Sequence, residues 1–573
     1  MTAESDQTDY ASWSHADLIA RISALESRLR ERNVAHSTPP SPQRPAFKKP
    51  KKASKPFDPS RYHTRLIALK FAYLGGNYNG FEHHSNNKTP LPTIEEEIWK
   101  ALRKCELIFP SFREGRSEEE VEWEGCEYSK CGRTDRGVSA FGQVIGVRVR
   151  SARPKAKERR VEDVDAGGQE GIEGRSDMAA GDGENQAPAD EDGTGAEPAE
   201  LSFDPVKDEL PYLQLLNRVL PPDIRILAWC PNPPEDFSAR FNCKERRYRY
   251  FFTNPAYPPL PGSNGRGDGW LDIEAMQEAA QKYEGLHDFR NFCKIDASKQ
   301  ITNFERRIFH AGIHAVGPEE EPANLLGHGL VSNGGAGAMQ HGPRLYWFEV
   351  RGSAFLWHQV RHLIAVLFLV GQGLEKPSVV DDLLDVEKTP SRPLYDMASD
   401  TPLVLWDCIF PDPTVLEASQ ADHQNSSNGN HVRGYEDGLD WIYVGDSRGG
   451  QDGSKRNPAG VEDGKYGRGG VMEDLWALWR KRKMDEVLAG SLMNVVARQG
   501  SAPVVGAWDV TSKSDRTYDG GELPRTVGTY TPIMLKARTE TFEVVNQRYA
   551  ERKGLVRKAG QAGAEIGTMD IDE

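Results

Sequence analysis

The most informative stretch of this chain reads Tyr128-Ser-Lys-Cys-Gly-Arg-Thr-Asp-Arg-Gly-Val-Ser-Ala-Phe-Gly-Gln143 and continues as Val144-Ile-Gly-Val-Arg-Val-Arg150. The second segment is rich in β-branched residues and alternates in polarity, which predicts a β-strand. Asp135 then lies on the loop that enters this strand. Its close neighbours are two glycines and two arginines, Gly132, Gly137, Arg133 and Arg136. A carboxylate on such a turn is a plausible nucleophile or general base that faces a polyanion.

Two structural interpretations compete with this chemical one. Asp beside Gly most often hydrogen-bonds its own turn, so Asp135 could be a turn residue. Arg133 could pair with a surface carboxylate. The loop taken alone favours these structural readings.

The composition predicts a folded core interrupted by insertions. The chain has 573 residues, of which only 38% are hydrophobic, together with 55 glycines and 37 prolines. Such a balance is typical of globular segments separated by disordered ones. The net charge of −14 argues against a nucleic-acid binder only at first sight. Thirteen Asp or Glu residues lie between Val161 and Glu200, beside a single Arg. A solvated acidic insertion leaves a basic binding face possible elsewhere.

The cysteines and the apolar segments predict a soluble intracellular protein. The seven cysteines are scattered and form no Cys-x-x-Cys pair, so neither a zinc site nor a disulfide framework is indicated. An odd, sparse set fits a reducing compartment. The first thirty residues lack the apolar stretch of a signal peptide. The longest apolar run, residues 363–370, falls short of the roughly 20 residues that span a bilayer.

Polarity and hydrophobic period divide the chain into six parts. Residues 15–30 carry Leu18, Ile22, Leu25 and Leu29 at the spacing of a short helix, and residues 38–57 form a Pro- and Lys-rich linker. That basic run is either a nuclear import signal, an RNA-contacting arm or plain linker. The predicted parts are an N-terminal helix and linker (1–62), a first folded segment (63–150), a disordered acidic insertion (151–204), the remainder of the folded domain (205–411), a second disordered insertion (412–470) and a helical, basic extension (471–573).

Strands and helices interleave within the folded segments. Thr93-Ile-Glu-Glu96 is a capping box, and Asp272 is a second candidate helix cap. The pattern predicts strands at 66–73, 144–150, 224–230, 247–252, 306–314, 345–351 and 403–410, and helices from 94, 210, 273, 357, 378 and 473. This interleaving predicts an α/β (α+β) protein. Pattern alone does not decide between parallel and antiparallel pairing.

The Asp135 loop also carries a resemblance. Residues 132–143 are similar to the catalytic motif of the TruA family of tRNA pseudouridine synthases, and the form with Arg136 resembles the eukaryotic branch that acts at tRNA positions 38 and 39. Further similar blocks follow in family order over 63–150, 205–315 and 344–412. They are Leu216-Asn-Arg-Val-Leu-Pro-Pro-Asp-Ile224, Phe237-Ser-Ala-Arg-Phe241, Arg246-Arg-Tyr-Arg-Tyr250, Gly285-Leu-His-Asp-Phe-Arg-Asn-Phe-Cys-Lys294 and Phe355-Leu-Trp-His-Gln-Val-Arg361.

The resemblance implies a fold and a chemistry. It implies two subdomains whose mainly antiparallel sheets, flanked by helices, meet at a basic RNA-binding cleft. It makes Asp135 the catalytic nucleophile, while Arg133 contacts RNA and helps to displace the target base. A nearby cation keeps such a carboxyl group ionised.

One predicted strand and one predicted helix supply the other candidates. On the strand, Tyr248 and Tyr250 share one face, and Arg247 and Arg249 share the other. Both tyrosines could be core residues beneath a solvated arginine row. The resemblance instead packs Tyr248 against the target uracil, where a ring replaces the lost stacking neighbours, and leaves Tyr250 in the core.

The helix from Trp357 carries a narrow polar stripe of His358, Arg361 and His362 on an apolar helix. The resemblance makes Arg361 an active-site partner of Asp135. His358 is either a substrate contact or a satisfied core histidine. With Arg136 and Arg247 as phosphate contacts, these residues complete the predicted site.

No metal or cofactor is predicted. His310 and His314 resemble metal ligands only superficially, since positions i and i+4 of a strand lie about 13 Å apart.

The expected activity is isomerisation of uridine to pseudouridine in the anticodon arm of tRNA, by a chain that resembles homodimeric bacterial relatives and acts in nucleus and cytoplasm. Two alternatives stay open. One is a catalytically silent RNA-binding protein of the same fold. The other is an Asp-dependent hydrolase, a class that commonly pairs two carboxylates across a pocket; no second acid recurs near the matched blocks.

Overall fold

The computed structural model describes most of the predicted folded segments. It covers residues 57–84, 89–111, 120–155, 203–258, 269–317, 343–412, 414, 434–446, 464–500 and 515–554. The helix expected at 15–30, almost all of the 38–57 linker and most of the acidic insertion lie outside these residues. The described residues from Pro59 onward belong to one compact unit.

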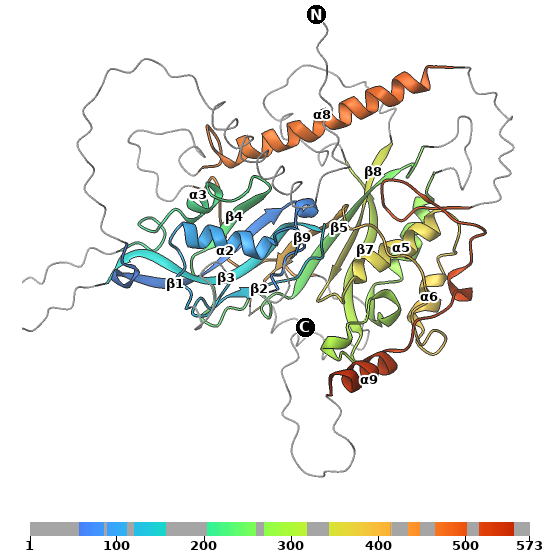
Figure 1. The fold of residues 1–573 in the computed structure, drawn as a ribbon, viewed down its shortest axis with the longest axis horizontal. Coiled ribbons are helices and arrows are strands. Elements are labelled where there is room, and N and C mark those ends of the chain that lie inside the picture. The colour runs from blue at the N-terminus through green and yellow to red at the C-terminus, as the bar shows by residue number, and fades with distance from the viewer. Residues whose placement is uncertain are drawn as a thin grey trace, which may run out of the picture. The chain divides into compact units, whose positions relative to one another are not determined.

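A ten-stranded, mainly antiparallel sheet forms the centre of this unit (Figure 1). Its strands are β1 (Tyr62–Tyr73), β2 (Ser129–Lys130), β3 (Ser139–Pro154), β4 (Ile224–Cys230), β5 (Glu245–Asn254), β6 (Gly285–Asp288), β7 (Glu305–Ala315), β8 (Arg344–Gly352), β9 (Leu403–Ile409) and β10 (Ile442–Tyr443). The spatial order is β10-β4-β1-β3-β9-β5-β8-β7-β6, with β2 beside β3. A short hairpin of β11 (Arg516–Thr517) and β12 (Arg525–Thr526) stands apart from it.

The two expected subdomain sheets are joined edge to edge. The β1 half comprises β10, β4, β1, β3 and β2, and the β5 half comprises β9, β5, β8, β7 and β6. They meet where β3 and β9 run parallel, with Ser139 opposite Val404. Every other pairing among the described strands of this sheet is antiparallel. The predicted α/β (α+β) class with mainly antiparallel sheets is confirmed.

Helices cover each half separately. They are α2 (Ile94–Lys104) and α3 (Tyr212–Asn217) on the β1 half, α4 (Ile273–Gln281), α5 (Gln359–Gly371) and α6 (Val379–Leu384) with the β5 half, then α8 (Val471–Ala497) and α9 (Phe542–Lys553) (Figure 1). Both predicted caps are confirmed, because the Thr93 hydroxyl accepts from the Glu96 N–H and the Asp272 carboxylate from the Ala275 N–H. No helix in the described ranges has the length and apolar character that a bilayer span requires.

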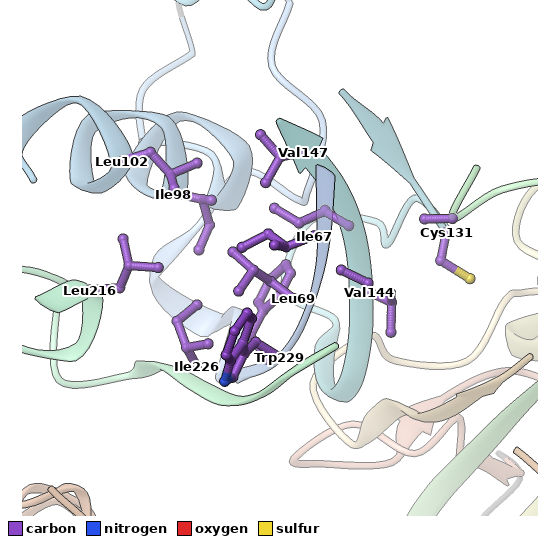
Figure 2. Packing of buried hydrophobic residues seen from close by; sticks show 14 of the residues in the cluster. Ile67, Leu69, Ile98, Leu102, Cys131, Val144, Val147, Leu216, Ile226 and Trp229 are labelled. Atoms are coloured by element: carbon purple, nitrogen blue, oxygen red, sulfur yellow. The ribbon is translucent and has the colours of Figure 1, made fainter. Parts of the chain in front are cut away.

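Each half has its own hydrophobic core. In the β1 half, Ile98 and Leu102 of α2 point toward Ile67 and Leu69 of β1 (Figure 2). Alternation along β1 places Ile67 and Leu69 on one face of the sheet, and α2 covers that face with its apolar stripe. In the β5 half, α5 is buried along nearly its whole length. The two cores meet at the junction, where Leu405 and Cys408 of β9 pack in the first core and Tyr248 contacts both cores.

The expectation of disorder across 412–470 is wrong for residues 434–446. There β10 pairs with β4, placing Ile442 opposite Trp229, and Trp441 packs against the first core. A polar composition predicts disorder because it offers little apolar surface, but backbone bonds to an open sheet edge need only a short segment.

The C-terminal extension is also more than a helical tail. Tyr518 and Ile533 are buried in the core of the β5 half, at 6% and 0% exposure. The predicted helix at 473–488 is confirmed and is longer, as α8.

Candidate active site

A cavity of about 750 Å³ lies where the two halves meet, and it collects the sequence blocks that carry the family resemblance. Asp135, Arg240, Tyr248, Lys294 and Arg361 come from five separate blocks, and all five line it. Segments that are up to about two hundred residues apart in sequence therefore share one surface. A volume of this size suits a small organic group such as one nucleotide.

Backbone and side-chain hydrogen bonds fix the loop that carries Asp135. The Tyr73 and Thr134 hydroxyls are 2.7 Å apart, and the Thr134 carbonyl accepts from the Phe81 N–H at 3.1 Å. The buried Gln143 amide donates to the Gly132 carbonyl at 3.0 Å. These contacts hold the residues that precede Asp135, and the Val138 N–H donates to the Asp135 carbonyl at 3.2 Å, so the carboxylate is presented from a rigid turn.

Gly137 makes this turn possible. Its φ of +82° is a left-handed conformation that side chains disfavour, and a Cβ there would lie 2.9 Å from the Asp400 carboxyl carbon. Asp400 also raises the pKa of Asp135. The expectation that no second acid recurs near the matched blocks is therefore wrong, because Asp400 lies within the matched segment 344–412. Asp400 lies behind the turn, however, and is absent from the residues that line the cavity within the described part of the chain.

The Asp135 carboxylate is partly buried in a positive environment. Burial raises its pKa above the ordinary value, while Arg361, a hydrogen bond from the Trp357 side chain and Lys294 act to lower it. The cations thus favour the ionised form that burial disfavours. An ionised, partly dehydrated carboxylate is a stronger nucleophile or base than one in water.

His358 lies beside this carboxylate, with its Nε2 3.4 Å from Asp135 Oδ2. Burial, followed by the charges of Arg361, Lys294 and Arg392, lowers its pKa to about 4. The neighbouring carboxylate favours a protonated imidazole, but burial and three cations outweigh it. His358 is therefore neutral at pH 7 and acts as a polar neighbour rather than a counter-ion. Its φ of +63° is a conformation uncommon outside glycine, and it immediately precedes α5.

Tyr248 stands on β5 with its ring edge against Phe355, at a centroid distance of 5.1 Å. Burial raises the pKa of its phenol far above the ordinary value, so the hydroxyl stays protonated. Tyr250 is fully buried in the core of the β5 half, as expected. The two tyrosines thus share a sheet face, but only the first lines the cavity.

The predicted arginines occupy different surroundings. Arg361 lines the cavity, and its Nε donates to the Ala398 carbonyl at 2.8 Å. Arg133 and Arg136 are exposed at the cavity wall, and Arg133 Nε lies 3.2 Å from Glu82 Oε2. Arg247 is not brought to the cavity, because it points to the other sheet face and binds Glu245 and the Tyr435 carbonyl.

Sequence reasoning missed several residues of the site. Arg246 donates to the carbonyls of Cys131, Arg240 and Ser353, so it ties the Asp135 loop to the β5 half. The Nζ of Lys294 lies 4.4 Å from the ring centroid of Trp357, a residue that is 39% exposed. An aromatic residue at the start of an apolar helix reads as core, so only the fold reveals an exposed ring.

The cavity wall is strongly basic. Nine lysine and arginine side chains line it, against three acidic ones. The chain's net charge of −14 therefore says little about this surface. Low-dielectric walls with one sign of charge concentrate ligands of the opposite sign, which here means phosphates.

Within the part of the chain that the structure describes, two groups of side chains could hold a metal ion. Cys131, Cys243 and Cys408 converge although they are scattered in sequence, and all three are fully buried. His310 and His314 converge with Glu349. The argument that these histidines are too far apart is wrong, since their Nε2 atoms lie 3.5 Å apart. The strand spacing applies to Cα atoms, and the two side chains lean toward one another.

Residues 279–411 match a family model described as tRNA pseudouridine synthase. The tRNA pseudouridine(38/39) synthase of Saccharomyces cerevisiae is 38% identical over 426 residues, which are 72% of this chain and 75% of that protein. The chain belongs to the TruA family of tRNA pseudouridine synthases.

Other members of the TruA family bear this out. A Homo sapiens tRNA pseudouridine(38/39) synthase is 40% identical over 65% of this chain and 61% of its own length. The alignment thus spans about three fifths of that relative. The tRNA pseudouridine synthase A of Methanoculleus marisnigri is 24% identical over 64% of this chain and 92% of its own length. The eukaryotic 38/39 branch that residues 132–143 resemble is the branch of the two more similar relatives.

Proposed function

We propose that this chain converts uridine to pseudouridine in the anticodon arm of tRNA, at positions 38 and 39, with Asp135 as its reactive carboxylate. The observation that carries the proposal is the cavity itself. It brings the Asp135 carboxylate, the Tyr248 ring and the cation of Arg361 to one basic surface. A flipped uridine needs these three features, namely a reactive group, a face to pack on and a counter-charge.

The reaction breaks the C1′–N1 glycosidic bond and joins uracil C5 to C1′. The hydrogen on C5 leaves as a proton, and N1 gains a proton, so the product is an isomer of the substrate. Asp135 either attacks uracil C6 or ribose C1′, or removes a sugar proton. In each route the detached base must stay in the site while it turns. Tyr248, braced by Phe355, supplies a rigid face for the base, and a cavity partly closed to water limits its escape.

The arginines have separable roles in this proposal. Arg361 favours the ionised form of Asp135 and balances its charge. Arg133 and Arg136 stand at the exposed rim, where they reach the RNA backbone and help to hold the target nucleotide out of its stack. Arg247 contacts neither the cavity nor Asp135, so its proposed contact with substrate applies only to RNA beyond the pocket.

Tritium release from tRNA labelled at uracil C5 tests the activity. Wild-type protein is expected to release tritium, and Asp135→Asn, which keeps the size of the side chain, is expected to release none above background. Binding of tRNA by Asp135→Asn should persist, because the basic wall is intact. Equal release by both proteins would remove Asp135 from the reaction, and no release by either would favour a silent RNA-binding protein.

The assembly and location are further parts of the proposal. A homodimer is supported by analogy with bacterial relatives, and α8 exposes Leu488, Leu492 and Val496 at helical spacing. Light scattering of the full chain measures its mass directly, and a monomeric mass would refute the dimer. The lysine-rich run between Lys48 and Lys55 supports action in nucleus as well as cytoplasm. Imaging a fluorescent fusion, with and without those lysines, tests this location.

A further inference from the structure

Three potential metal ligands gather on the sheet face that points away from Tyr248. Tyr248 pairs with Val350 of β8. The residue before it, Glu349, therefore faces the opposite side of the sheet. Gly312 of β7 pairs with Glu349, which places the carboxylate between His310 and His314 along the neighbouring strand. The ligand atoms of the three side chains all lie within 4.8 Å of one another.

Gly312 leaves the space in which they meet. A Cβ built on Gly312 would lie 3.2 Å from His310 Nε2 and 3.3 Å from His314 Nε2. Both imidazoles therefore lean over the glycine, one from each side. A larger residue at this position would occupy the volume that the two ring nitrogens face.

The distance between the ring nitrogens suits a shared ion. His310 Nε2 and His314 Nε2 are 3.5 Å apart, which is long for a hydrogen bond. Two ligands bound tetrahedrally to Zn²⁺ at about 2.05 Å lie about 3.3 Å apart. The pair therefore needs only a small adjustment to bind one ion.

A carboxylate orients the first histidine. Glu284 Oε1 lies 3.1 Å from His310 Nδ1 and also accepts from the Ala311 N–H at 3.0 Å. Hydrogen bonding to Glu284 places the proton of His310 on Nδ1, so that Nε2 presents its lone pair toward His314. Carboxylate–histidine pairs of this kind hold the rings of metal-binding histidines in many proteins.

The local charge also suits a cation. Glu284 lies beside His310, and among the described residues Glu349 faces a single cation, Arg249, whose Nε lies 3.4 Å from Glu349 Oε1. The guanidinium of Arg249 lies over the rings of Trp347 and Trp406, with its Cζ 4.4 and 4.1 Å from the two ring centroids. A carboxylate has two oxygens and about four lone-pair directions. Glu349 can therefore accept a hydrogen bond from Arg249 and bind a metal ion at the same time.

We propose that His310, His314 and Glu349 bind one divalent cation of the Zn²⁺ class, with a fourth position open to water. Two imidazoles and one carboxylate are a set that Zn²⁺ accepts. None of the three residues lines the reaction cavity. The ion ties β7 to β8 and stabilises the β5 half without taking part in the isomerisation.

Cobalt(II) titration of the metal-free full chain tests the site. Tetrahedral Co²⁺ gives visible absorption that hexahydrated Co²⁺ nearly lacks, and added Zn²⁺ should displace it. We expect one equivalent to bind to the wild type without the intense near-ultraviolet band of cobalt–thiolate ligation, which would mark binding at Cys131, Cys243 and Cys408 instead. His310→Ala and His314→Ala should abolish the visible absorption. Glu284→Gln should weaken Co²⁺ binding about 10-fold or more, because it removes the orienting carboxylate. The surface variant His63→Ala, on β1, is the matched control and should bind as the wild type does.

A second readout separates metal binding from folding. Zn²⁺ should raise the melting temperature of the wild type and of His63→Ala but not that of His314→Ala. Tritium release without added metal should be equal in all of these proteins, which shows that each variant is folded. No stoichiometric Co²⁺ binding by the wild type, or binding that survives both histidine substitutions, would overturn the proposal.

Discussion

The two walls of the cavity are built in different ways. The β1 half contributes a loop, residues 131–136, whose reactive carboxylate is presented by a turn that hydrogen bonds and Gly137 hold in place. The β5 half contributes side chains from regular elements, with Tyr248 on β5 and Arg361 on α5. The wall from the β1 half therefore supplies the reactive carboxylate. The wall from the β5 half supplies the aromatic face and the cation beside that carboxylate.

The difference indicates how a single family can combine reactivity with a rigid site. A loop can bring a carboxylate close to a substrate, whereas strands and helices fix aromatic rings more firmly. Arg246 connects the two walls, because its guanidinium binds Cys131 O of the loop and Ser353 O of the β5 half. Substitutions in the two walls should therefore have different kinetic signatures.

Arg361→Gln should have the largest effect on this comparison. It removes the cation that favours ionised Asp135, and loss of one such electrostatic group costs about 100- to 1000-fold in kcat. The pKa of Asp135 is already raised by burial, and Arg361 lowers it. Without Arg361 the pKa rises further. Because activity needs the ionised carboxylate, the acid limb of the kcat–pH profile should move to higher pH.

Arg361→Lys is the control for that prediction. It keeps a positive charge but loses the Nε–H bond to the Ala398 carbonyl. We expect Arg361→Lys to leave the acid limb near its wild-type position while kcat falls less than in Arg361→Gln. If both variants shift the limb equally, the effect belongs to the lost hydrogen bond rather than to the charge. Single-turnover rates across pH measure this directly.

Tyr248→Leu tests the aromatic wall. A base that stacks on an aromatic ring gains about 1–3 kcal/mol, so kcat/KM should fall about 5- to 150-fold. Phe355→Leu removes only the edge contact that braces the ring, and aromatic pairs contribute about 0.5–1.5 kcal/mol, so its loss in kcat/KM should be about 10-fold or less. Tritium-release kinetics measure both.

Phe251→Leu is the matched aromatic control on the same strand. Phe251 faces the other side of the sheet, where its ring contacts Trp347 and Trp406. Its substitution should leave kcat/KM unchanged. A fall in kcat/KM as large as that of Tyr248→Leu would show that any weakening of β5, and not the lost face, impairs the reaction.

Local sequence signals predicted the elements but not where distant segments meet. Thr93 and Asp272 were recognisable caps because a cap bonds to a backbone N–H only three residues away. The pairing of β10 with β4 joins residues about two hundred positions apart, and nothing in the local pattern of 434–446 specifies its partner. The same holds for Cys131, Cys243 and Cys408, which only the fold brings together.

The candidate site divides in the same way. Asp135, Tyr248 and Arg361 were predicted by motif, and the fold gathers them in one cavity. Alternation along β5 correctly separated Tyr248 from Arg247, but it could not say which face held the cavity. The prediction that His310 and His314 lie too far apart to share a metal ion was wrong. Cα spacing takes no account of the length of the side chains or of the space that Gly312 leaves between the rings.

Arg136→Gln is expected to have the smallest effect and probes the rim of the loop wall. Arg136 is exposed and lines the cavity, so it should contact phosphate without touching the reacting base. We expect tRNA affinity to fall a few-fold while kcat at saturating tRNA is unchanged. The slope of log Kd against log salt should decrease by about 0.7–0.9, the value for one lost phosphate contact.

The matched control for Arg136 is Arg148→Gln, which removes an arginine from the same half of the sheet. Arg148 pairs with Glu127 at 2.7 Å and does not line the cavity. Its loss should leave both tRNA affinity and the salt slope unchanged. The variant should also fold normally, because exposed ion pairs contribute at most about 1 kcal/mol to stability. Filter binding over a range of salt concentrations compares the two variants. If Arg136→Gln instead lowers kcat and leaves the salt slope intact, this arginine acts on the flipped base, and the division between a charged rim and a reactive loop must be redrawn.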